Sequence, residues 1–226
     1  MVSGIIAAGG SSIRFGTGQN KTLCLLAGRP VLAYSLRIFL ASTAVDEVIL
    51  VARSGEEQAV RALAQSLAPQ KPVAVVTGGA DRVASVQKGL AAAKGEIVLI
   101  HDGARPFVTE EMIADCLAAL EEADGVTTAI PSRDTVKLAD ERGNVIATTC
   151  RRETFLVQTP QAFCREQLLR LHRTLSDHDM VTDDCMLLER AGLRVKLVAG
   201  SERNLKITTP NDLLLAEFYL KKEPTE

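Results

Sequence analysis

The first residues of this chain combine small side chains with two spaced cations. A short apolar segment, 4–8, leads into Gly9 and Gly10, and Arg14 and Lys21 follow. Small residues let a backbone approach a ligand closely, and consecutive N–H groups then bind phosphate oxygens. A planar guanidinium and an ammonium supply the positive charge that a bare loop lacks. The segment therefore indicates a nucleoside triphosphate site.

Two familiar phosphate-binding loops do not fit this segment. In the dinucleotide fingerprint G-x-G-x-x-G the second glycine would stand at position 11, which is serine here. The P-loop pattern G-x-x-x-x-G-K-[ST] does not match the residues that lead to Lys21. Taken alone, residues 9–21 also fit a strand-to-helix turn with two solvated cations, so both interpretations stay open here.

A second motif follows the apolar segment 73–77. Two glycines come first, and Arg82 and Ser85 lie a few residues further on. The glycines permit close backbone approach, Ser85 offers a hydroxyl group, and Arg82 is suited to anchor the loop or a ligand. The alternative is a plain β-to-helix turn with Asp81 as the helix N-cap.

A third motif, beginning with His101 and Asp102, follows the apolar segment 97–100. A carboxylate at a strand's carboxyl end, beside small residues such as Ala104, suits a ligand for Mg²⁺ or for a ribose hydroxyl. An ion pair between Asp102 and Arg105 is the competing use of that charge. His101 borders an apolar strand, so the sequence favours a structural, hydrogen-bonded histidine over a catalytic one.

These motifs sit in a chain whose apolar runs alternate with helical patterns. Such alternation builds a mostly parallel sheet with right-handed crossovers, and ligands bind beyond the carboxyl ends of its strands. We expect an α/β fold with residues 1–226 as one domain. The expected strands are 4–8, 47–52, 73–77, 97–100, 125–130 and 194–198, and the expected helices are 30–41, 56–67, 82–93, 109–123, 165–175, 182–191 and 210–220.

Residues 132–155 interrupt the alternation. Segments 135–138 and 145–149 resemble two short strands around a charged Gly-Asn turn. An isolated hairpin is only marginally stable in water. We therefore expect this β-hairpin to be an inserted arm that packs on another subunit.

Composition excludes several classes of protein. The net charge of −2 gives no basic field for nucleic acid. No apolar run reaches the eighteen or so residues of a membrane span, and the N-terminus lacks a signal-peptide pattern. The five cysteines are odd in number and have no C-x-x-C spacing, which indicates neither disulfides nor a zinc site. We expect a cytoplasmic protein that binds neither nucleic acid nor membrane.

Further polar residues are weak signals one by one: Thr182 fits a helix N-cap, and Lys206 fits a solvated strand. Together with the motifs above they closely resemble one family, 2-C-methyl-D-erythritol 4-phosphate cytidylyltransferase of the non-mevalonate isoprenoid pathway. The resemblance spans nearly the whole chain. It is carried, in order, by Ala7-Ala8-Gly9 with Arg14 and Lys21, Gly78-Gly79 with Arg82 and Ser85, residues 101–106, Arg133-Asp134-Thr135, residues 159–163, Thr182-Asp183-Asp184 and residues 204–208.

The resemblance implies a Rossmann-like nucleotidyltransferase fold, CTP and Mg²⁺ as ligands, a sugar-alcohol phosphate as acceptor, and a homodimer joined through the hairpin arm. It assigns catalysis to Arg14, Lys21, Arg151 and Lys206. It assigns nucleotide binding to Ala7, Ala8, Gly9, Gly79, Arg82, Ser85, Asp102 and Ala104, with Asp102 also on the metal. It assigns acceptor binding to Thr135, Arg151, Thr159, Thr182, Lys206 and Thr208.

Two departures from the family pattern leave alternatives open. The loop from Gly9 to Arg14 is one residue longer than the common G-x-G-x-R, and Ala80 replaces a frequent acidic residue. One alternative suggested by these departures is that the chain is a regulatory protein that binds nucleotide and no longer catalyses a reaction. A second alternative is a cytidylyltransferase for another polyol phosphate, such as ribitol 5-phosphate, because the same CTP pocket serves both.

Overall fold

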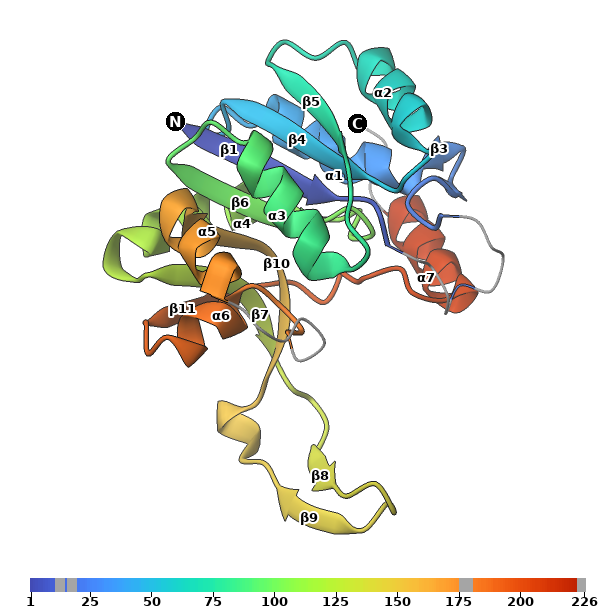
Figure 1. The fold of residues 1–226 in the computed structure, drawn as a ribbon. Coiled ribbons are helices and arrows are strands. Elements are labelled where there is room, and N and C mark those ends of the chain that lie inside the picture. Colours follow the sequence, from blue (N-terminus) through green and yellow to red (C-terminus); the bar gives the residue numbers. More distant parts are fainter. Residues whose placement is uncertain (11–14, 16–19, 175–180, 223–226) are drawn as a thin grey trace.

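The computed structural model describes residues 1–10, 15, 20–174 and 181–222. Within these ranges seven strands form a central sheet in the order β11-β7-β10-β6-β1-β4-β5 (Figure 1). They are β1 (Val2–Ala7), β4 (Glu47–Ala52), β5 (Val73–Thr77), β6 (Ile97–Asp102), β7 (Gly125–Pro131), β10 (Phe155–Cys164) and β11 (Val195–Ala199). The predicted mostly parallel sheet is confirmed: β1 pairs in parallel with β4 and β6, β4 with β5, and β7 with β11.

Strand β10 departs from that prediction. It lies between β6 and β7 and is antiparallel to both. The sequence analysis did not predict it because Pro160 lies near its centre and the buried Gln158, Thr159 and Gln161 remove any apolar alternation. The register shifts between Val157 and Gln161, and the Thr159–Pro160 peptide is cis.

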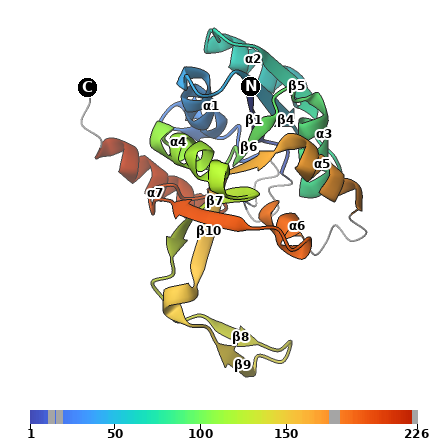
Figure 2. The same ribbon diagram turned by 90° about the vertical axis from the view of Figure 1, so that its left-hand side faces the viewer.

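Helices cover both faces of the sheet, giving three layers (Figure 2). On β4, Val48 and Leu50 face one helical layer, and Ile49 and Val51 face the other. This alternation explains why the strand is apolar throughout. The first layer contains α1 (Val31–Ala41), α2 (Glu57–Ser66) and α4 (Glu110–Ala119), and the second contains α3 (Arg82–Ala92), α5 (Arg165–Thr174) and α6 (Cys185–Arg190).

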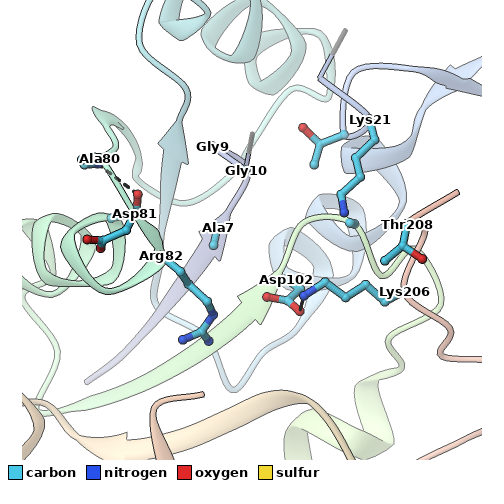
Figure 3. A pocket seen from close by; sticks show the side chains of 14 residues that line it. Ala7, Gly9, Gly10, Lys21, Ala80, Asp81, Arg82, Asp102, Lys206 and Thr208 are labelled. Carbon is cyan, nitrogen blue, oxygen red and sulfur yellow. Dashed lines mark hydrogen bonds and ion pairs between the residues drawn. The ribbon is translucent and has the colours of Figure 1, made fainter. Parts of the chain in front are cut away.

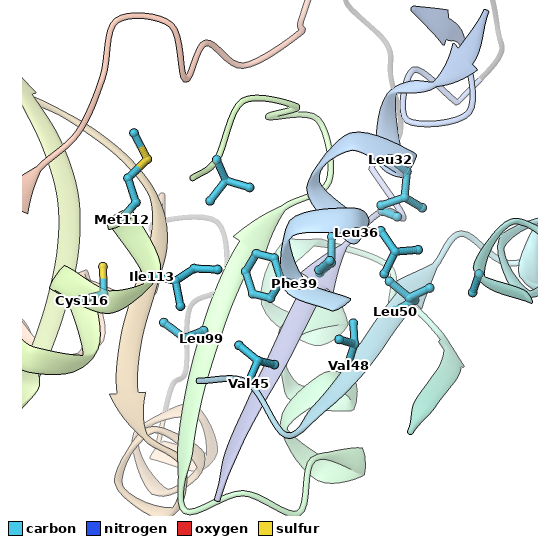
Figure 4. Close-up of a cluster of buried hydrophobic side chains, with 14 of the residues drawn as sticks. Leu32, Leu36, Phe39, Val45, Val48, Leu50, Leu99, Met112, Ile113 and Cys116 are labelled. Atoms are coloured by element: carbon cyan, nitrogen blue, oxygen red, sulfur yellow. The ribbon is translucent and has the colours of Figure 1, made fainter. Parts of the chain in front are cut away.

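The larger buried cluster packs α1 against the middle strands (Figure 4). Leu36 and Phe39 are fully buried there, next to Leu50 and Leu99. A Cβ atom at Gly4 would lie 2.5 Å from Cδ1 of Phe39. Glycine in β1 therefore lets the α1 aromatic ring approach the sheet backbone.

Helix α6 begins later than predicted. It starts at Cys185 instead of Thr182, and Thr182 does not cap it. The Asp183 Oδ1 atom accepts the Met186 N–H at 3.1 Å, while the Asp184 side chain is fully buried and bound to Arg82. Asp183 thus accepts a local bond at the start of the helix, while Asp184 is held by a tertiary contact that sequence periodicity does not report.

An arm projects from the sheet between the end of β7 at Pro131 and the start of β10 at Phe155 (Figure 1). It contains the antiparallel pair β8 (Lys137–Ala139) and β9 (Val145–Thr148), followed by the short helix η3 (Arg151–Glu153). Apolar side chains on it face solvent, with Ile146 69% exposed. The hairpin rests on no other strand in the described residues.

The chain closes with helix α7 (Pro210–Lys221), which packs near the short pair β2 (Leu25–Leu26) and β3 (Arg29–Pro30). A capping box between Thr209 and Asp212 begins α7. The turn η2 (Leu120–Glu122) follows α4. Among the described residues no helix has the length and apolar character needed to cross a membrane.

Candidate active site

A pocket of about 250 Å³ lies where β1 and β6 end (Figure 3). The parallel register pairs Ala7 with Asp102, the last residues of these strands. The Gly103 N–H donates to the Ala7 carbonyl at 2.9 Å, which keeps the two strand ends together. The structure brings ten of the predicted residues to this pocket: Ala7, Gly9, Lys21, Gly79, Arg82, Ser85, Asp102, Ala104, Lys206 and Thr208.

Asp102 is the electrostatic centre of the pocket. Its Oδ2 lies 2.7 Å from Lys206 Nζ and 3.7 Å from Arg105 Nε. Burial alone would raise the pKa of this carboxyl, but Lys206, Arg82 and Arg105 outweigh burial and hold the pKa well below its usual range. Asp102 is therefore ionised at neutral pH, and the predicted pairing with Arg105 is present.

His101 and Thr159 hold the backbone behind Asp102. The Asp102 N–H donates to Thr159 Oγ1 at 3.0 Å, and Thr159 Oγ1 donates to His101 Nδ1 at 2.9 Å. His101 Nε2 then donates to the Arg105 carbonyl at 3.0 Å. Burial lowers the pKa of His101 to about 4, so the ring is neutral at pH 7. The predicted structural role of His101 is confirmed.

Arg82 stands on the first turn of α3, opposite Asp102 (Figure 3). Its Nη2 donates to Oδ2 of the buried Asp184 at 2.6 Å. Burial lowers the pKa of this guanidinium, but Asp184 and Asp102 outweigh burial and raise it. The cation is therefore permanent and fixed. Asp81 caps α3 as predicted, accepting the Ala84 N–H at 2.7 Å.

The Gly78-Gly79 loop is tight because its backbone meets α3. Ser85 Oγ accepts the Gly79 N–H at 3.0 Å. A Cβ atom at Gly79 would overlap the Ala84 side chain and lie 2.8 Å from the Ala84 carbonyl carbon. Only glycine lets the loop lie this close to the helix, and the loop in turn forms one wall of the pocket.

A second pocket, of about 240 Å³, adjoins the first. Both are lined by Arg82, Asp102 and Lys206. The second pocket adds the predicted Thr159 and Thr182. Sequence reasoning gave no ligand role to its other lining residues Arg105, Val157, Gln158, Gln161 and Asp183, most of which lie on or beside the unpredicted β10.

Among the described residues, three predicted ones line neither pocket. The Ala8 side chain is fully buried in the core. Arg14 lies outside the described residues. On the arm, Arg151 Nη2 donates to Thr135 Oγ1 at 2.9 Å, and neither residue lines either pocket. Thr135 and Arg151 are therefore presented together, away from the pockets of their own chain.

The pocket also contains Gly10, Thr22, Ala80 and Asp81, which the sequence analysis did not assign as site residues. Each of them is next in sequence to a predicted site residue, and this adjacency was the signal that could have identified them as pocket residues. No group of three or more His, Cys, Asp or Glu that would hold a metal occurs among residues 1–10, 15, 20–174 and 181–222. One or two carboxylates with substrate phosphates suffice for Mg²⁺, and an ionised Asp102 fits that pattern.

A three-layer α/β sheet that gathers glycines and fixed cations at its carboxyl edge is the framework of a nucleotidyltransferase. Comparison with known families shows which nucleotidyltransferase family the chain matches. The sequence model of the 2-C-methyl-D-erythritol 4-phosphate cytidylyltransferase family matches residues 2–222. The chain belongs to this family, and the resemblance drawn from its motifs is confirmed.

Individual relatives agree with that assignment. The 2-C-methyl-D-erythritol 4-phosphate cytidylyltransferase of Caldanaerobacter subterraneus subsp. tengcongensis is 40% identical over 225 residues, covering 98% of this chain and 99% of its own. That of Geobacter metallireducens is 41% identical over 234 residues, covering 98% of each chain. The crystal structure of 4-diphosphocytidyl-2C-methyl-D-erythritol synthase from Anaerococcus prevotii superposes with a TM-score of 0.87 at 34% identity, covering 98% of this chain and 99% of that one.

Proposed function

We propose that this chain transfers CMP from CTP to 2-C-methyl-D-erythritol 4-phosphate. The products are 4-diphosphocytidyl-2-C-methyl-D-erythritol and pyrophosphate, in isoprenoid precursor synthesis. The observation that carries the proposal is the pair of adjoining pockets that share Arg82, Asp102 and Lys206. One pocket has the glycine-lined wall and Lys21 that a nucleotide requires, and the other has the polar side chains that an acceptor requires.

The nucleotide occupies the first pocket. Its base and ribose lie against small residues that admit close backbone contact, and its triphosphate lies toward Lys21, with Arg14 as the second cation. Tight walls leave little room for a purine ring, so CTP is preferred over ATP and GTP. We assign the base and ribose contacts to Ala7, Gly9, Gly79, Arg82, Ser85, Asp102 and Ala104. Ala8 is left out, because its side chain is buried and its N–H and carbonyl are bonded within the fold.

Asp102 is the protein residue that would hold Mg²⁺ together with the phosphates of the nucleotide. Its low pKa keeps a negative charge available there at neutral pH. When bound, the ion neutralises charge on the phosphate oxygens. The chain's own cations Lys21, Arg82 and Lys206, which line the first pocket, stabilise the remaining charge.

The acceptor phosphate occupies the second pocket. Lys206, Thr159 and Thr182 line this pocket and contact the phosphate, and Thr208 lies in the adjoining first pocket of the same subunit. Arg151 and Thr135 reach the phosphate from the arm of a second subunit, because they line neither pocket of their own chain. A homodimer through the arm, and the cytoplasmic location expected from the sequence, are parts of this proposal.

The reaction follows from charge. A phosphate oxygen of the acceptor attacks the α-phosphorus of CTP in line, and pyrophosphate leaves. A phosphate monoester has a second pKa of about 6, so it is already a nucleophile at neutral pH and needs no general base. His101 agrees with this, since both of its nitrogens are occupied in the core. Lys21 and Arg14 stabilise charge on the leaving pyrophosphate, and Arg151 and Lys206 orient the attacking phosphate.

Initial rates of pyrophosphate release test the proposal. With the methylerythritol phosphate as acceptor, CTP is expected to turn over on the order of a hundredfold faster than ATP, since the tight walls of the pocket leave little room for the second ring of adenine. Equal rates with both nucleotides would show that the first pocket does not select cytidine. CTP binding without pyrophosphate release from any acceptor would favour the regulatory alternative. Faster release with ribitol 5-phosphate would favour the other polyol phosphate.

A further inference from the structure

Lys21 is flanked by two buried polar residues. Asn20 and Thr22 are each 3% exposed. Between them the Lys21 side chain points into the nucleotide pocket (Figure 3). Burying polar side chains without hydrogen bonds is costly, so the partners of these two residues decide what the arrangement does.

The Asn20 amide uses all of its hydrogen-bonding capacity. Nδ2 donates to the Ala8 carbonyl at 2.7 Å and to Glu56 Oε2 at 2.5 Å. Oδ1 accepts the Thr22 N–H at 3.1 Å and the Thr22 hydroxyl at 2.9 Å. The Ala8 carbonyl lies 3.3 Å from the same hydroxyl as a second acceptor. A fully satisfied buried network of this kind fixes the groups that it joins.

This network joins three parts of the fold at the edge of the sheet. Ala8 directly follows β1, and its N–H donates to the Val51 carbonyl of β4. Glu56 precedes α2 and accepts the Val60 N–H through its carbonyl. The Thr22 carbonyl accepts the Leu32 N–H of α1 at 2.8 Å. The backbone on both sides of Lys21 is thereby tied to elements of the core.

We propose that Asn20 is a positioning residue for Lys21, acting through the Ala8 carbonyl and the Glu56 carboxylate. This inference rests on the proposed role of Lys21 at the leaving pyrophosphate. Lysine is a point charge on a flexible stem, so its contribution depends on where its backbone is held. A displacement of about 1 Å is enough to cost a large part of a rate when it misplaces a charged contact. Asn20 itself does not touch the reacting atoms.

Asn20→Asp tests this with a nearly isosteric side chain. The aspartate loses both N–H donors and places a carboxylate against Glu56, so the network opens. We expect kcat to fall on the order of tenfold or more, with the KM values for CTP and acceptor changing less than about threefold. The Thr22 amide is expected to exchange with solvent faster, as measured by NMR or mass spectrometry.

The reciprocal pair Asn20→Asp/Glu56→Gln restores one bond with its donor and acceptor exchanged, because the new amide at position 56 would donate to the new carboxylate at position 20. We expect the double variant to regain kcat to within about threefold of Glu56→Gln alone, and to slow the Thr22 amide again. Thr77→Val is the matched control, since it removes the exposed bond from Thr77 Oγ1 to Glu57 Oε1 at the same end of α2. That control is expected to leave kcat unchanged.

Lys21→Ala separates failure of this inference from failure of the proposed function. If Lys21→Ala loses about a hundredfold in kcat while Asn20→Asp stays within twofold of wild type, the positioning role is wrong and the active site stands. If Lys21→Ala itself keeps most of its activity, the role proposed for Lys21 fails. A loss in Asn20→Asp that the double variant does not reverse would make Asn20 a structural residue only.

Thr22→Val keeps the test decisive should Asn20→Asp not fold. This variant replaces the hydroxyl by a methyl group and leaves the Asn20 amide in place. We expect a few-fold loss of kcat with faster exchange of the Thr22 amide. Unchanged kcat together with unchanged exchange in Thr22→Val would overturn the proposal.

Discussion

Lys206 Nζ lies 2.7 Å from Asp102 Oδ2. The proposed acceptor phosphate must therefore share this lysine with a carboxylate instead of capturing a solvated side chain. Such pairing fixes the ammonium and lowers the entropy lost on binding. The same carboxylate balances Arg105 and lies opposite Arg82. A carboxylate among these cations lowers the net positive charge, so the site can hold two anionic substrates without binding any single phosphate too tightly.

Replacing Lys21 by alanine isolates one cation at the nucleotide phosphates. We expect kcat to fall about a hundredfold, the usual scale for losing one charge contact to a transition state. The affinity for CTP should weaken less, because charge on the leaving pyrophosphate grows only as the bond breaks. Steady-state kinetics measure both quantities. Lys94→Ala, at an exposed position away from either pocket, is the control. More than half of wild-type kcat in Lys21→Ala would place that lysine on the solvated surface.

Burial of His101 predicts a pH dependence of stability. Its folded pKa of about 4 lies below the unfolded value of about 6.5, so the unfolded chain binds a proton that the folded protein excludes. The free energy of unfolding should therefore drop as pH falls through this window, by about 2 kcal/mol between pH 7 and pH 5 for this group. Urea unfolding at the two pH values measures the difference.

His101→Gln provides the comparison for that experiment, since it keeps an N–H donor for the Arg105 carbonyl and does not titrate. Its free energy of unfolding should change by less over the same pH range. An identical pH dependence in the two proteins would show that His101 is not the titrating group.

At the scale of single residues, the sequence predicts those site residues that stand at the end of a strand. Asp102 follows an apolar segment, so the sequence placed it at the sheet edge. Ala7 and Ala8 were assigned together by the family resemblance, and only the structure separates Ala7, which lines the pocket, from Ala8, whose side chain is buried in the core. Asn20 carries no motif at all. Its role follows from contacts with Ala8 and Glu56, which only the fold brings near.

At the scale of elements, the regular βα units were predictable and β10 was not. Apolar β4 was predicted with its observed bounds, since both faces are buried and the run is unbroken. Strand β10 instead buries Gln158, Thr159 and Gln161, and the Nε2 groups of the two glutamines donate to the Ser201 carbonyl and to Thr127 Oγ1. Sequence periodicity cannot supply those partners. The strand that forms the floor of the second pocket was therefore missed.

Gly79→Ala tests the contact between the glycine loop and α3. The added Cβ would collide with Ala84, so the loop must move away from the helix and carry the pocket wall with it. We expect the KM for CTP to rise on the order of tenfold, with a smaller effect on the KM for the acceptor. Adding Ala84→Gly removes part of the collision and should recover part of the CTP affinity. An unchanged KM in Gly79→Ala would mean that the loop does not contact the nucleotide.

At the scale of the whole molecule, the arm leaves Arg151 and Thr135 together on an exposed hairpin. Exposed Leu138, Val145 and Ile146 accompany them, as expected of a surface that is covered in an assembly. The proposed dimer uses the guanidinium as a bidentate clamp on the acceptor phosphate, a role that lysine fills poorly.

Subunit complementation tests this sharing of sites. Arg151→Ala should raise the KM for the sugar phosphate and leave CTP affinity nearly unchanged. Mixed with Lys21→Ala, and after verified subunit exchange, it should regain about a quarter of wild-type activity. Half of the dimers are then mixed, and each mixed dimer has one intact site. A mixture as inactive as its parents would place Arg151 in the site of its own chain.

The central claim is the transfer of CMP to one particular sugar phosphate, and phosphorus NMR observes that transfer directly. The purified protein, Mg²⁺ and CTP would be mixed with equal amounts of 2-C-methyl-D-erythritol 4-phosphate and ribitol 5-phosphate. We predict that diphosphate-ester and pyrophosphate signals grow together while the methylerythritol monoester signal disappears and the ribitol monoester signal persists. Persistence of both monoesters with no pyrophosphate, or consumption of the ribitol monoester first, would contradict the account.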